Sequence, residues 1–184
     1  GVHARDGVTG LPNTTPEAPV LQQHLRRLVD SGHAAAVLEV SSHGLVLQRV
    51  AGLPFAAAVF TNLTRDHLDF HGTADAYLEA KSRLFAQLAP NAVGVINADD
   101  AHAGFMRAHC TGRVVTYGRQ AGADYRLAAI APRPGGMRLD LVGPRGRLSL
   151  AADLHGEFNA YNIAAAAACS LELGATAEAL SGAL

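Results

Sequence analysis

The chain has 184 residues, of which 49% are hydrophobic and 17% are charged, and its formal net charge is −1. This length accommodates one domain with a sizeable core, and the composition excludes a disordered protein. Because the charges nearly cancel, the chain has no basic field that would attract nucleic acid, and no nucleic-acid partner is expected.

Cysteine usage and the apolar runs define the expected environment. Cys110 and Cys169 form no CxxC pair, so the sequence predicts neither a disulfide framework nor a zinc knuckle. A reducing cytoplasm is the compartment that such cysteine usage favours. No apolar run approaches the roughly 20 residues of a transmembrane helix, so no membrane span is predicted, and no signal peptide is recognised.

The first predicted element is a helix that begins near Thr15 and stops at Gly32. Thr15 is the expected N-cap, and Pro16 fits the first helical position. The expected apolar stripe consists of Ala18, Leu21, Leu25, Leu28 and Val29. Since a cap uses one hydroxyl, Asn13 and Thr14 remain available to hold a ligand, although an ordinary helix start explains them equally.

Four apolar segments, interleaved with helical ones, are predicted to form parallel strands: residues 34–40, 56–60, 93–96 and 113–117. The helical segments lie near 74–89 and 101–109. This βαβ series predicts an α/β fold, with an open and mostly parallel sheet flanked by helices. Polar residues follow the strands, among them Ser41, Asn62 and Asp99, at the edge where such sheets bind ligands. Glu39 lies inside the first strand, where an acid needs a cation or hydrogen-bond donors.

From Tyr125 the apolar residues alternate with a period of two, and residues 143–146 separate two such runs, which predicts a hairpin. We therefore expect a small antiparallel sheet over about 123–154, appended to the parallel part over about 13–120. Closing helices follow over about 157–184, the first of them rich in alanine. Asn159 and Asn162 lie three residues apart near its start, on one face. The whole is expected to form a single domain.

Lys81 is the anomaly in the predicted helix after residue 74. Its predicted apolar stripe consists of Tyr77, Leu78, Lys81, Leu84, Phe85 and Leu88. A lysine on such a face can extend its amine to the surface, pair with an acid, or lose its charge. A neutral amine reacts with carbon dioxide to form a carbamate, which would turn the cation into a carboxylate-like metal ligand. An ion pair is the commoner explanation.

The sequence supports metal binding better than it supports a carbamate at Lys81. The supporting residues are at position 39 and at positions 66–71. Glu39, Asp66, His67, Asp69 and His71 offer oxygen and imidazole ligands and no thiolate, which favours magnesium or manganese over structural zinc. The spacing His67-x-Asp69-x-His71 would indicate a metallohydrolase only if the segment were a strand. Gly72 and Thr73 instead predict a loop that leads into the N-cap of the next helix.

Five segments together resemble one protein family: residues 13–17, 39–45, 61–72, 79–81 and 97–100. Their residues are similar to the central domain of the Mur ligases, and within that family to the MurE type, the UDP-N-acetylmuramoyl-tripeptide synthetases of peptidoglycan synthesis. The matches run in family order to about residue 175. The resemblance implies ATP-dependent amide formation, in which the D-glutamyl carboxylate of UDP-MurNAc-L-Ala-D-Glu becomes an acyl phosphate and is attacked by a diamino acid.

The resemblance also implies a role for individual residues. Glu39 corresponds to a ligand of the Mg²⁺ that bridges the ATP phosphates, and His67 to a ligand of a second Mg²⁺. Lys81 corresponds to the family's carbamylated lysine (N6-carboxylysine), which serves that second ion. The positions that hold UDP-MurNAc-dipeptide are Asn13, Thr14, Thr15, Ser41 and Arg49. Asn159 and Asn162 correspond to asparagines near the adenine of ATP.

Two departures from the family pattern limit these expectations. Leu47 stands where the pattern often has a glutamine, and Gln48 follows it, which puts one substrate contact in doubt. No GxxxxGK[ST] phosphate loop occurs in the chain; in the family this loop, an N-terminal uridine-binding domain and a C-terminal amino-acid-binding domain lie outside the matching part. We therefore expect a truncated central domain that is inactive alone, from a cytoplasmic protein that acts as a monomer.

Two other functions stay open at the level of sequence. One is a metal-dependent hydrolase that uses His67, Asp69 and His71 with a carboxylated Lys81. The other is a non-catalytic module that binds a nucleotide sugar. The sequence does not distinguish meso-diaminopimelate from lysine as the added residue, because the family selects it with a domain that these residues do not match.

Overall fold

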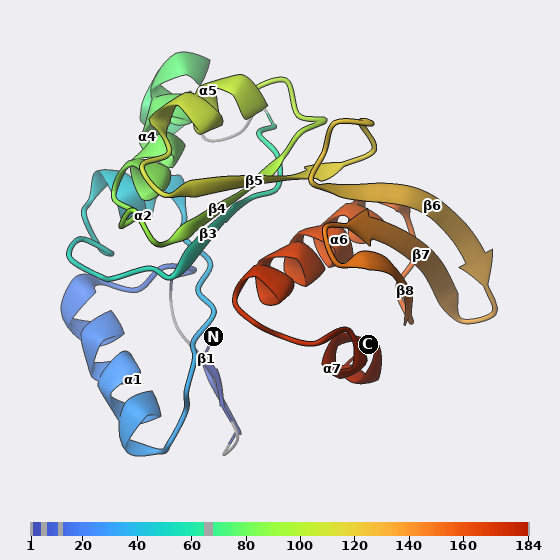
Figure 1. Ribbon diagram of the computed structural model, residues 1–184. Coiled ribbons are helices and arrows are strands. Elements are labelled where there is room, and N and C mark those ends of the chain that lie inside the picture. Colours follow the sequence, from blue (N-terminus) through green and yellow to red (C-terminus); the bar gives the residue numbers. More distant parts are fainter. Residues whose placement is uncertain (1, 5–6, 11–12, 65–67, 184) are drawn as a thin grey trace. The chain divides into compact units, whose positions relative to one another are not determined.

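The computed structural model describes residues 2–4, 7–10, 13–64 and 68–183. By its internal contacts the chain divides into two compact units. Unit 1 consists of Gly1–Leu53 and His67–Arg83, and unit 2 of Pro54–Asp66 and Leu84–Leu184. Figure 1 labels helices and strands of both units.

Unit 1 is mainly helical. Its two short strands pair in antiparallel fashion, which the sequence did not predict. Helix α4 follows Thr73, whose hydroxyl accepts a hydrogen bond from the Ala76 amide at 3.1 Å, so the predicted N-cap at this position is confirmed. The elements are β1 (Val2–Ala4), β2 (Gly7–Thr9), α1 (Ala18–Asp30), α2 (Ser42–Val46), α3 (Leu68–His71) and α4 (Ala74–Ala86), the last three residues of which belong to unit 2.

Helix α1 begins at Ala18, two residues later than the predicted first helical position at Pro16, with Glu17 in the N-cap position. Thr15 is not a cap. Its side chain is fully buried, and its hydroxyl donates to the Glu39 carbonyl oxygen and accepts from the Ser41 amide, both at 2.9 Å. Because this hydroxyl bonds to a distant segment, it cannot satisfy the first amides of the helix. The predicted stop is confirmed at Gly32, which has a φ of 76°.

The predicted strand over residues 34–40 is wrong. These residues form neither helix nor strand, and most of their side chains are exposed, including that of Val37. A buried parallel strand needs hydrogen-bonding neighbours on its edges. Within residues 2–4, 7–10, 13–64 and 68–183, no strand pairs with this segment. An apolar run establishes only the capacity for burial, whereas pairing depends on what lies beside it.

Helix α2 ends in a Schellman motif that has glutamine where glycine is usual. The Arg49 amide donates to the Gly44 carbonyl oxygen at 2.8 Å, and the Gln48 amide to that of Leu45 at 3.2 Å. This geometry gives Gln48 a φ of 56°. A left-handed conformation costs a residue with a Cβ about 1 kcal/mol, and glycine avoids that cost.

Gln48→Gly is therefore expected to stabilise the protein by about 0.5–1 kcal/mol, because glycine adopts the observed φ without steric strain. Denaturant unfolding of the variant and the wild type measures the difference. The matched control is Gln22→Gly in the middle of α1, which should destabilise by about 1 kcal/mol. Equal destabilisation by both changes would contradict the strain at Gln48.

Unit 2 contains a six-stranded sheet with the order β3-β4-β5-β6-β7-β8. Strands β3 to β6 run parallel, and β6, β7 and β8 are antiparallel. The antiparallel part therefore continues the main sheet, whose mostly parallel α/β character confirms the predicted fold class. The elements are β3 (Ala57–Phe60), β4 (Val93–Asn97), α5 (Ala103–His109), β5 (Arg113–Gly118), β6 (Tyr125–Arg133), β7 (Gly136–Gly143), β8 (Gly146–Ala152), α6 (Glu157–Glu172) and α7 (Ala177–Ala183).

Strand β4 lies at the centre of the unit 2 core, and all five of its residues are buried. Val93 and Val95 belong to the cluster that includes the alanine face of α6, and α6 packs under the sheet in Figure 1. Gly94 faces the other side, where a Cβ would lie 2.5 Å from the Cys110 sulfur. The alanine-rich helix and Gly94 thus allow close packing on both faces of the strand.

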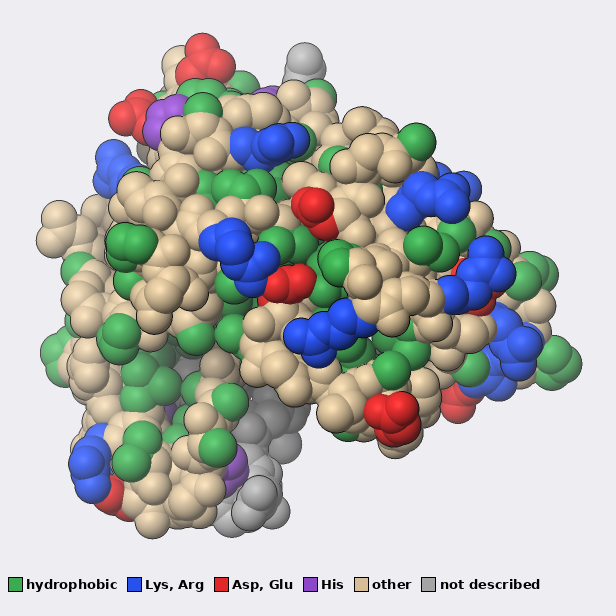
Figure 2. Space-filling model, viewed as in Figure 1, with side chains coloured by type: hydrophobic (Ala, Val, Ile, Leu, Met, Phe, Trp, Pro, Cys, Tyr) green, Lys and Arg blue, Asp and Glu red, His purple; other side chains and the backbone are tan. Residues whose placement is uncertain are grey.

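Strands β6 to β8 bury one face and expose the other to solvent. Leu139, Leu141 and Leu150 belong to the core. Figure 2 shows basic side chains gathered over this part of the surface, with acidic ones among them, and Arg133 forms an ion pair with Asp153. In the part of the chain that the structure describes, no helix is long and apolar enough to cross a membrane.

Candidate functional site

A pocket of about 340 Å³ lies in unit 2, at the carboxyl ends of β3 and β4 and beside the first two turns of α6. Open parallel sheets bind ligands at this edge. Most of the lining residues have polar side chains, and α6 contributes two aromatic rings. Its residues are Thr61, Asn62, Asn97, Asp99, Asp100, Glu157, Phe158, Tyr161 and Asn162.

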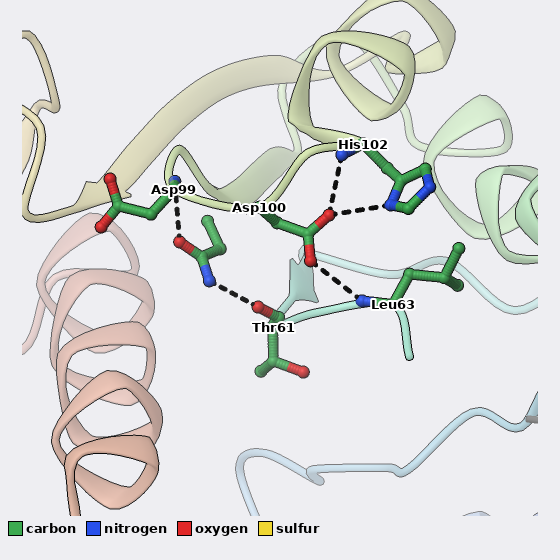
Figure 3. A network of polar contacts seen from close by, with 6 residues as sticks. Thr61, Leu63, Asp99, Asp100 and His102 are labelled. Carbon is green, nitrogen blue, oxygen red and sulfur yellow. Dashed lines mark hydrogen bonds and ion pairs between the residues drawn. The ribbon is translucent and has the colours of Figure 1, made fainter. Parts of the chain in front are cut away.

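Residues 97–100 form a turn at the carboxyl end of β4, and hydrogen bonds connect this turn to the segment that follows β3 (Figure 3). The Asn97 side chain donates to the Thr61 carbonyl oxygen at 2.7 Å and accepts from the Asp99 amide at 3.0 Å. Asp100 accepts from the Leu63 amide at 3.1 Å and from the His102 amide at 2.8 Å. This turn therefore holds residues 61–63 of the segment that follows β3.

The two aspartates of the turn point in opposite directions in Figure 3. Asp100 points to the segment after β3, whereas Asp99 points to α6 and to the loop after β5. The Asp99 carboxylate accepts a hydrogen bond from the Tyr161 hydroxyl at 2.7 Å. It also accepts from the amides of Arg119 at 2.5 Å and Gln120 at 3.2 Å.

Burial and the bond to Asp99 raise the pKa of Tyr161 to about 12. In an unfolded chain the phenol titrates near 10. A group whose pKa is raised by folding stabilises the native state below its unfolded pKa and loses that contribution as the pH rises through the folded value. The free energy of unfolding should therefore fall between about pH 10 and 12. Denaturant unfolding across that range measures this fall, and Tyr161→Phe should reduce it.

The structure separates the two asparagines of α6. Asn162 lines the pocket. Asn159, predicted to act beside it, does not line the pocket. Its side-chain amide nitrogen donates to the His155 carbonyl oxygen at 2.8 Å. Phe158, which the sequence analysis did not select, lines the pocket with a side chain that is 70% exposed. The sequence signal that could have found Phe158 is an aromatic residue in the first turn of the predicted helix, next to Asn159 and near Asn162.

Unit 1 brings together three of the predicted substrate residues. Besides bonding to Glu39 and Ser41 through its hydroxyl, Thr15 accepts a hydrogen bond from the Arg49 guanidinium through its carbonyl oxygen, at 3.0 Å. Arg49 also forms an ion pair with Glu17, and its buried Nε has no partner among the described residues. The guanidinium is thus held between the Thr15 carbonyl oxygen and the Glu17 carboxylate.

The ends of this cluster are open to solvent. Asn13, Thr14 and the Glu39 side chain are exposed, whereas Thr15 is buried. Gly44 packs against the cluster, since a Cβ there would lie 2.9 Å from the Thr15 methyl group. The exposed residues are therefore available to a ligand, and the buried threonine fixes the segment that presents them.

Lys81 is half-buried, and its amine lies 5.2 Å from the centre of the Tyr77 ring. Of the predicted apolar stripe, Tyr77, Leu78 and Phe85 are buried within α4 and Leu88 is buried just after its end, whereas Leu84 is half-buried. The amine is favourably placed over the electron-rich face of the ring. The stripe is thus confirmed, with the lysine at its margin.

Rings from α2, α3 and α4 stack near Lys81. The His71 and Tyr77 ring centres are 5.1 Å apart, and His71 Nε2 lies 2.9 Å from the Ser42 hydroxyl. His43 packs on Phe70 at 4.0 Å. His71 thus links the start of α2 to α4.

The remaining predicted metal ligands divide into two groups. Asp66 and His67 lie outside the described residues. Asp69 and His71 belong to α3, so the alternation that would aim them in one direction with His67 does not occur. Within the described ranges, no three His, Cys, Asp or Glu side chains converge as a metal site would require. The metallohydrolase interpretation required a strand, and residues 68–71 are helical instead.

An open, mostly parallel sheet flanked by helices, with a pocket at the carboxyl ends of two of its strands, defines an α/β domain of the class that binds ligands at this edge. The chain belongs to the Mur ligase family, because the pattern of the Mur ligase middle domain matches residues 2–170. This confirms the predicted resemblance.

Relatives support the same assignment. A UDP-N-acetylmuramoyl-L-alanyl-D-glutamate--2,6-diaminopimelate ligase from Geobacillus kaustophilus is 40% identical over 191 residues, which cover 100% of this chain and 39% of that protein. The protein of the same name from Gloeobacter violaceus is 44% identical over 172 residues, or 94% of this chain and 35% of its own length. The chain thus spans less than two fifths of the length of these relatives.

Solved structures show the same fold. A UDP-N-acetylmuramoyl-L-alanyl-D-glutamate--2,6-diaminopimelate ligase superposes with a TM-score of 0.83 at 38% identity, over 94% of this chain and 37% of that chain. Mycobacterium tuberculosis folylpolyglutamate synthase complexed with ADP superposes with a TM-score of 0.65 at 21% identity, over 84% of this chain and 36% of that chain. The second likeness concerns the fold alone.

Proposed function

We propose that the protein containing this chain is an ATP-dependent ligase of peptidoglycan precursor synthesis. It would join a diamino acid to the D-glutamyl carboxylate of UDP-MurNAc-L-Ala-D-Glu. The observation that carries this proposal is the 40% identity, across the whole chain, to a ligase named for these substrates. Those names favour 2,6-diaminopimelate over lysine as the added residue. The natural setting of this reaction is the cytoplasm, and no partner other than small molecules is required.

The reaction has two chemical steps. The γ-phosphoryl group of ATP passes to the D-glutamyl carboxylate, which releases ADP and forms an acyl phosphate. The amine of the diamino acid then attacks the carbonyl carbon, and phosphate and a proton leave. Because phosphoryl transfer depends mainly on positioning and on charge neutralisation, the residues of this chain would act by holding the reactants.

We assign the pocket of unit 2 to the nucleotide. Phe158 offers an exposed ring face to a base, and Asn162 offers an amide that can both donate and accept hydrogen bonds. Asn159 would act indirectly, through its bond to the His155 carbonyl.

We assign the cluster of unit 1 to the UDP-MurNAc-dipeptide. The dipeptide and the diphosphate are anionic, and Arg49 supplies a positive charge beside the exposed residues Asn13 and Thr14. Thr15 holds that guanidinium through its carbonyl oxygen. Asn13, Thr14 and Ser41 would provide further polar contacts.

We propose Glu39, His67 and Lys81 as the residues that hold Mg²⁺. Glu39 is exposed, and Lys81 would provide an oxygen ligand after its neutral amine adds carbon dioxide and loses a proton. This set of oxygen and imidazole donors without thiolate fits Mg²⁺. When bound, Mg²⁺ would neutralise the charge of the phosphates.

The test uses the full-length natural protein with UDP-MurNAc-L-Ala-D-Glu, ATP and either meso-diaminopimelate or lysine. Mass spectrometry of the product and release of ADP measure ligation. Formation of the UDP-MurNAc-tripeptide only in the presence of ATP is the expected result. Hydrolysis of a small amide without ATP, or tight binding of the UDP substrate without any product, would show that the protein is a hydrolase or a binding module instead.

A further inference from the structure

Asp99 connects three parts of unit 2 through one carboxylate. It lies after β4, it accepts the Tyr161 hydroxyl of α6 at 2.7 Å, and it accepts the Arg119 and Gln120 amides from the loop after β5. Gly118 completes the contact, because a Cβ at this glycine would lie 2.6 Å from the carboxylate oxygen. The loop backbone therefore encloses the carboxylate closely.

A second link reinforces the same arrangement. Arg119 forms an ion pair with Glu157 at 2.7 Å, and Gln120 donates from its side chain to the Ala98 carbonyl oxygen at 2.8 Å. Both partners of the ion pair are exposed, so this pair contributes little by itself. The bonds to Asp99 involve a charged acceptor and are the stronger ones.

The contacts made by Asp99 affect the pocket in two ways. Tyr161, Phe158 and Asn162 are all carried by the first two turns of α6, so a fixed Tyr161 fixes the other two relative to β4. In addition, a carboxylate without donors beside a nucleotide would repel the phosphates. Three donors satisfy the Asp99 carboxylate and reduce that repulsion.

We propose that Asp99 is a positioning residue for the nucleotide: by holding the Tyr161 hydroxyl and the Arg119–Gln120 backbone, it sets the place of Asn162 and Phe158 in the pocket. Asp99 itself lines the pocket, and the proposed positioning effect is exerted through its bond to Tyr161 of α6. This inference rests on the proposed function, since it assumes that the pocket takes ATP.

The test is Tyr161→Phe in the full-length protein, with ATP affinity measured by equilibrium dialysis and KM and kcat measured in the ligation assay. Loss of a hydrogen bond to a charged group should raise the Kd and KM for ATP about tenfold. Since only nucleotide binding is affected, kcat and the KM for the UDP substrate should stay within about twofold.

Tyr125→Phe is a matched control. The Tyr125 hydroxyl donates to the Glu172 carboxylate at 2.5 Å, which is also a tyrosine-to-acid bond on α6, but Tyr125 and Glu172 do not line the pocket. This variant should lower the melting temperature and leave the Kd for ATP unchanged. An equal rise in Kd in both variants would reduce Asp99 to a structural role and overturn the proposal.

Asp99→Asn completes a double-mutant cycle with Tyr161→Phe. If the two residues act together through their hydrogen bond, the Kd of the double variant for ATP should not exceed the higher of the two single-variant Kd values. An unchanged Kd in Tyr161→Phe, or additive effects of the two substitutions on the Kd, would overturn the inference while the proposed function stands.

If the wild-type protein binds ATP but forms no tripeptide, the proposed function fails and the Kd comparison still decides the role of Asp99. A wild-type protein that binds no ATP would overturn both.

Discussion

Replacing Lys81 with alanine in the full-length protein is expected to lower kcat for ligation by about a thousandfold, equivalent to ~4 kcal/mol of transition-state stabilisation. The reason is loss of the carbamate oxygen proposed to hold Mg²⁺ against the phosphates. The Kd for UDP-MurNAc-L-Ala-D-Glu should change by less than about threefold, because the proposed contacts to this substrate come from other residues. Initial rates of ADP release and a binding titration measure the two quantities.

Arg83→Ala provides the matched control for Lys81. Arg83 is an exposed cation on the same helix, two residues further along. Its removal should leave kcat and the Kd for UDP-MurNAc-L-Ala-D-Glu unchanged, as expected for a surface substitution. A carbamate can also be observed directly, as a ¹³C resonance after equilibration with labelled bicarbonate, which Lys81→Ala should abolish. If Lys81→Ala retained ligation, the carbamate proposal would fall.

Gly136→Ala is expected to destabilise unit 2 by about 3 kcal/mol. A Cβ at Gly136 would lie 2.0 Å from the Ala152 carbonyl oxygen, which is backbone and cannot rotate away. Strands β7 and β8 would have to separate at their ends, and overpacking of this kind costs roughly 1–3 kcal/mol or more. Chemical unfolding, together with hydrogen exchange of the β7 and β8 amides, measures the loss.

Gly122→Ala shows whether the steric contact is the cause. No atom lies within 4 Å of a Cβ at Gly122, and its backbone does not require glycine. This change should alter the free energy of unfolding by no more than about 0.5 kcal/mol. Similar losses in both variants would show that the contact with Ala152 is not the cause, since the loss of chain entropy in the unfolded state would by itself stabilise a Gly→Ala variant.

Local patterns predicted most of unit 2. The hairpin of β7 and β8, the alanine-rich helix α6 and the parallel strands β3 to β5 follow from periodicity and turn residues within a few positions of each other. The parallel pairing itself followed from the βαβ order. These predictions succeeded because each depends on neighbours in sequence or on a general rule of connection.

Predictions that depended on distant partners were less successful. Residues 34–40 have the composition of a buried strand, but no described residue pairs with them. Thr15 has the sequence context of an N-cap, but its hydroxyl bonds to Glu39 and Ser41. In both cases a long-range contact, or its absence, outweighed the local preference.

The sequence by itself determined the family, the order of most elements and the polar segments at positions 13–17 and 39–41 of unit 1 and 97–100 of unit 2. It also marked Lys81 as an unusual residue on an apolar face. Only the tertiary structure decided that Asp99 and Asp100 point in opposite directions, that Tyr161 and Phe158 line the pocket, and that Asn159 does not. Residue type and spacing determine which groups are present, whereas hydrogen bonds between segments distant in the chain determine where each side chain points.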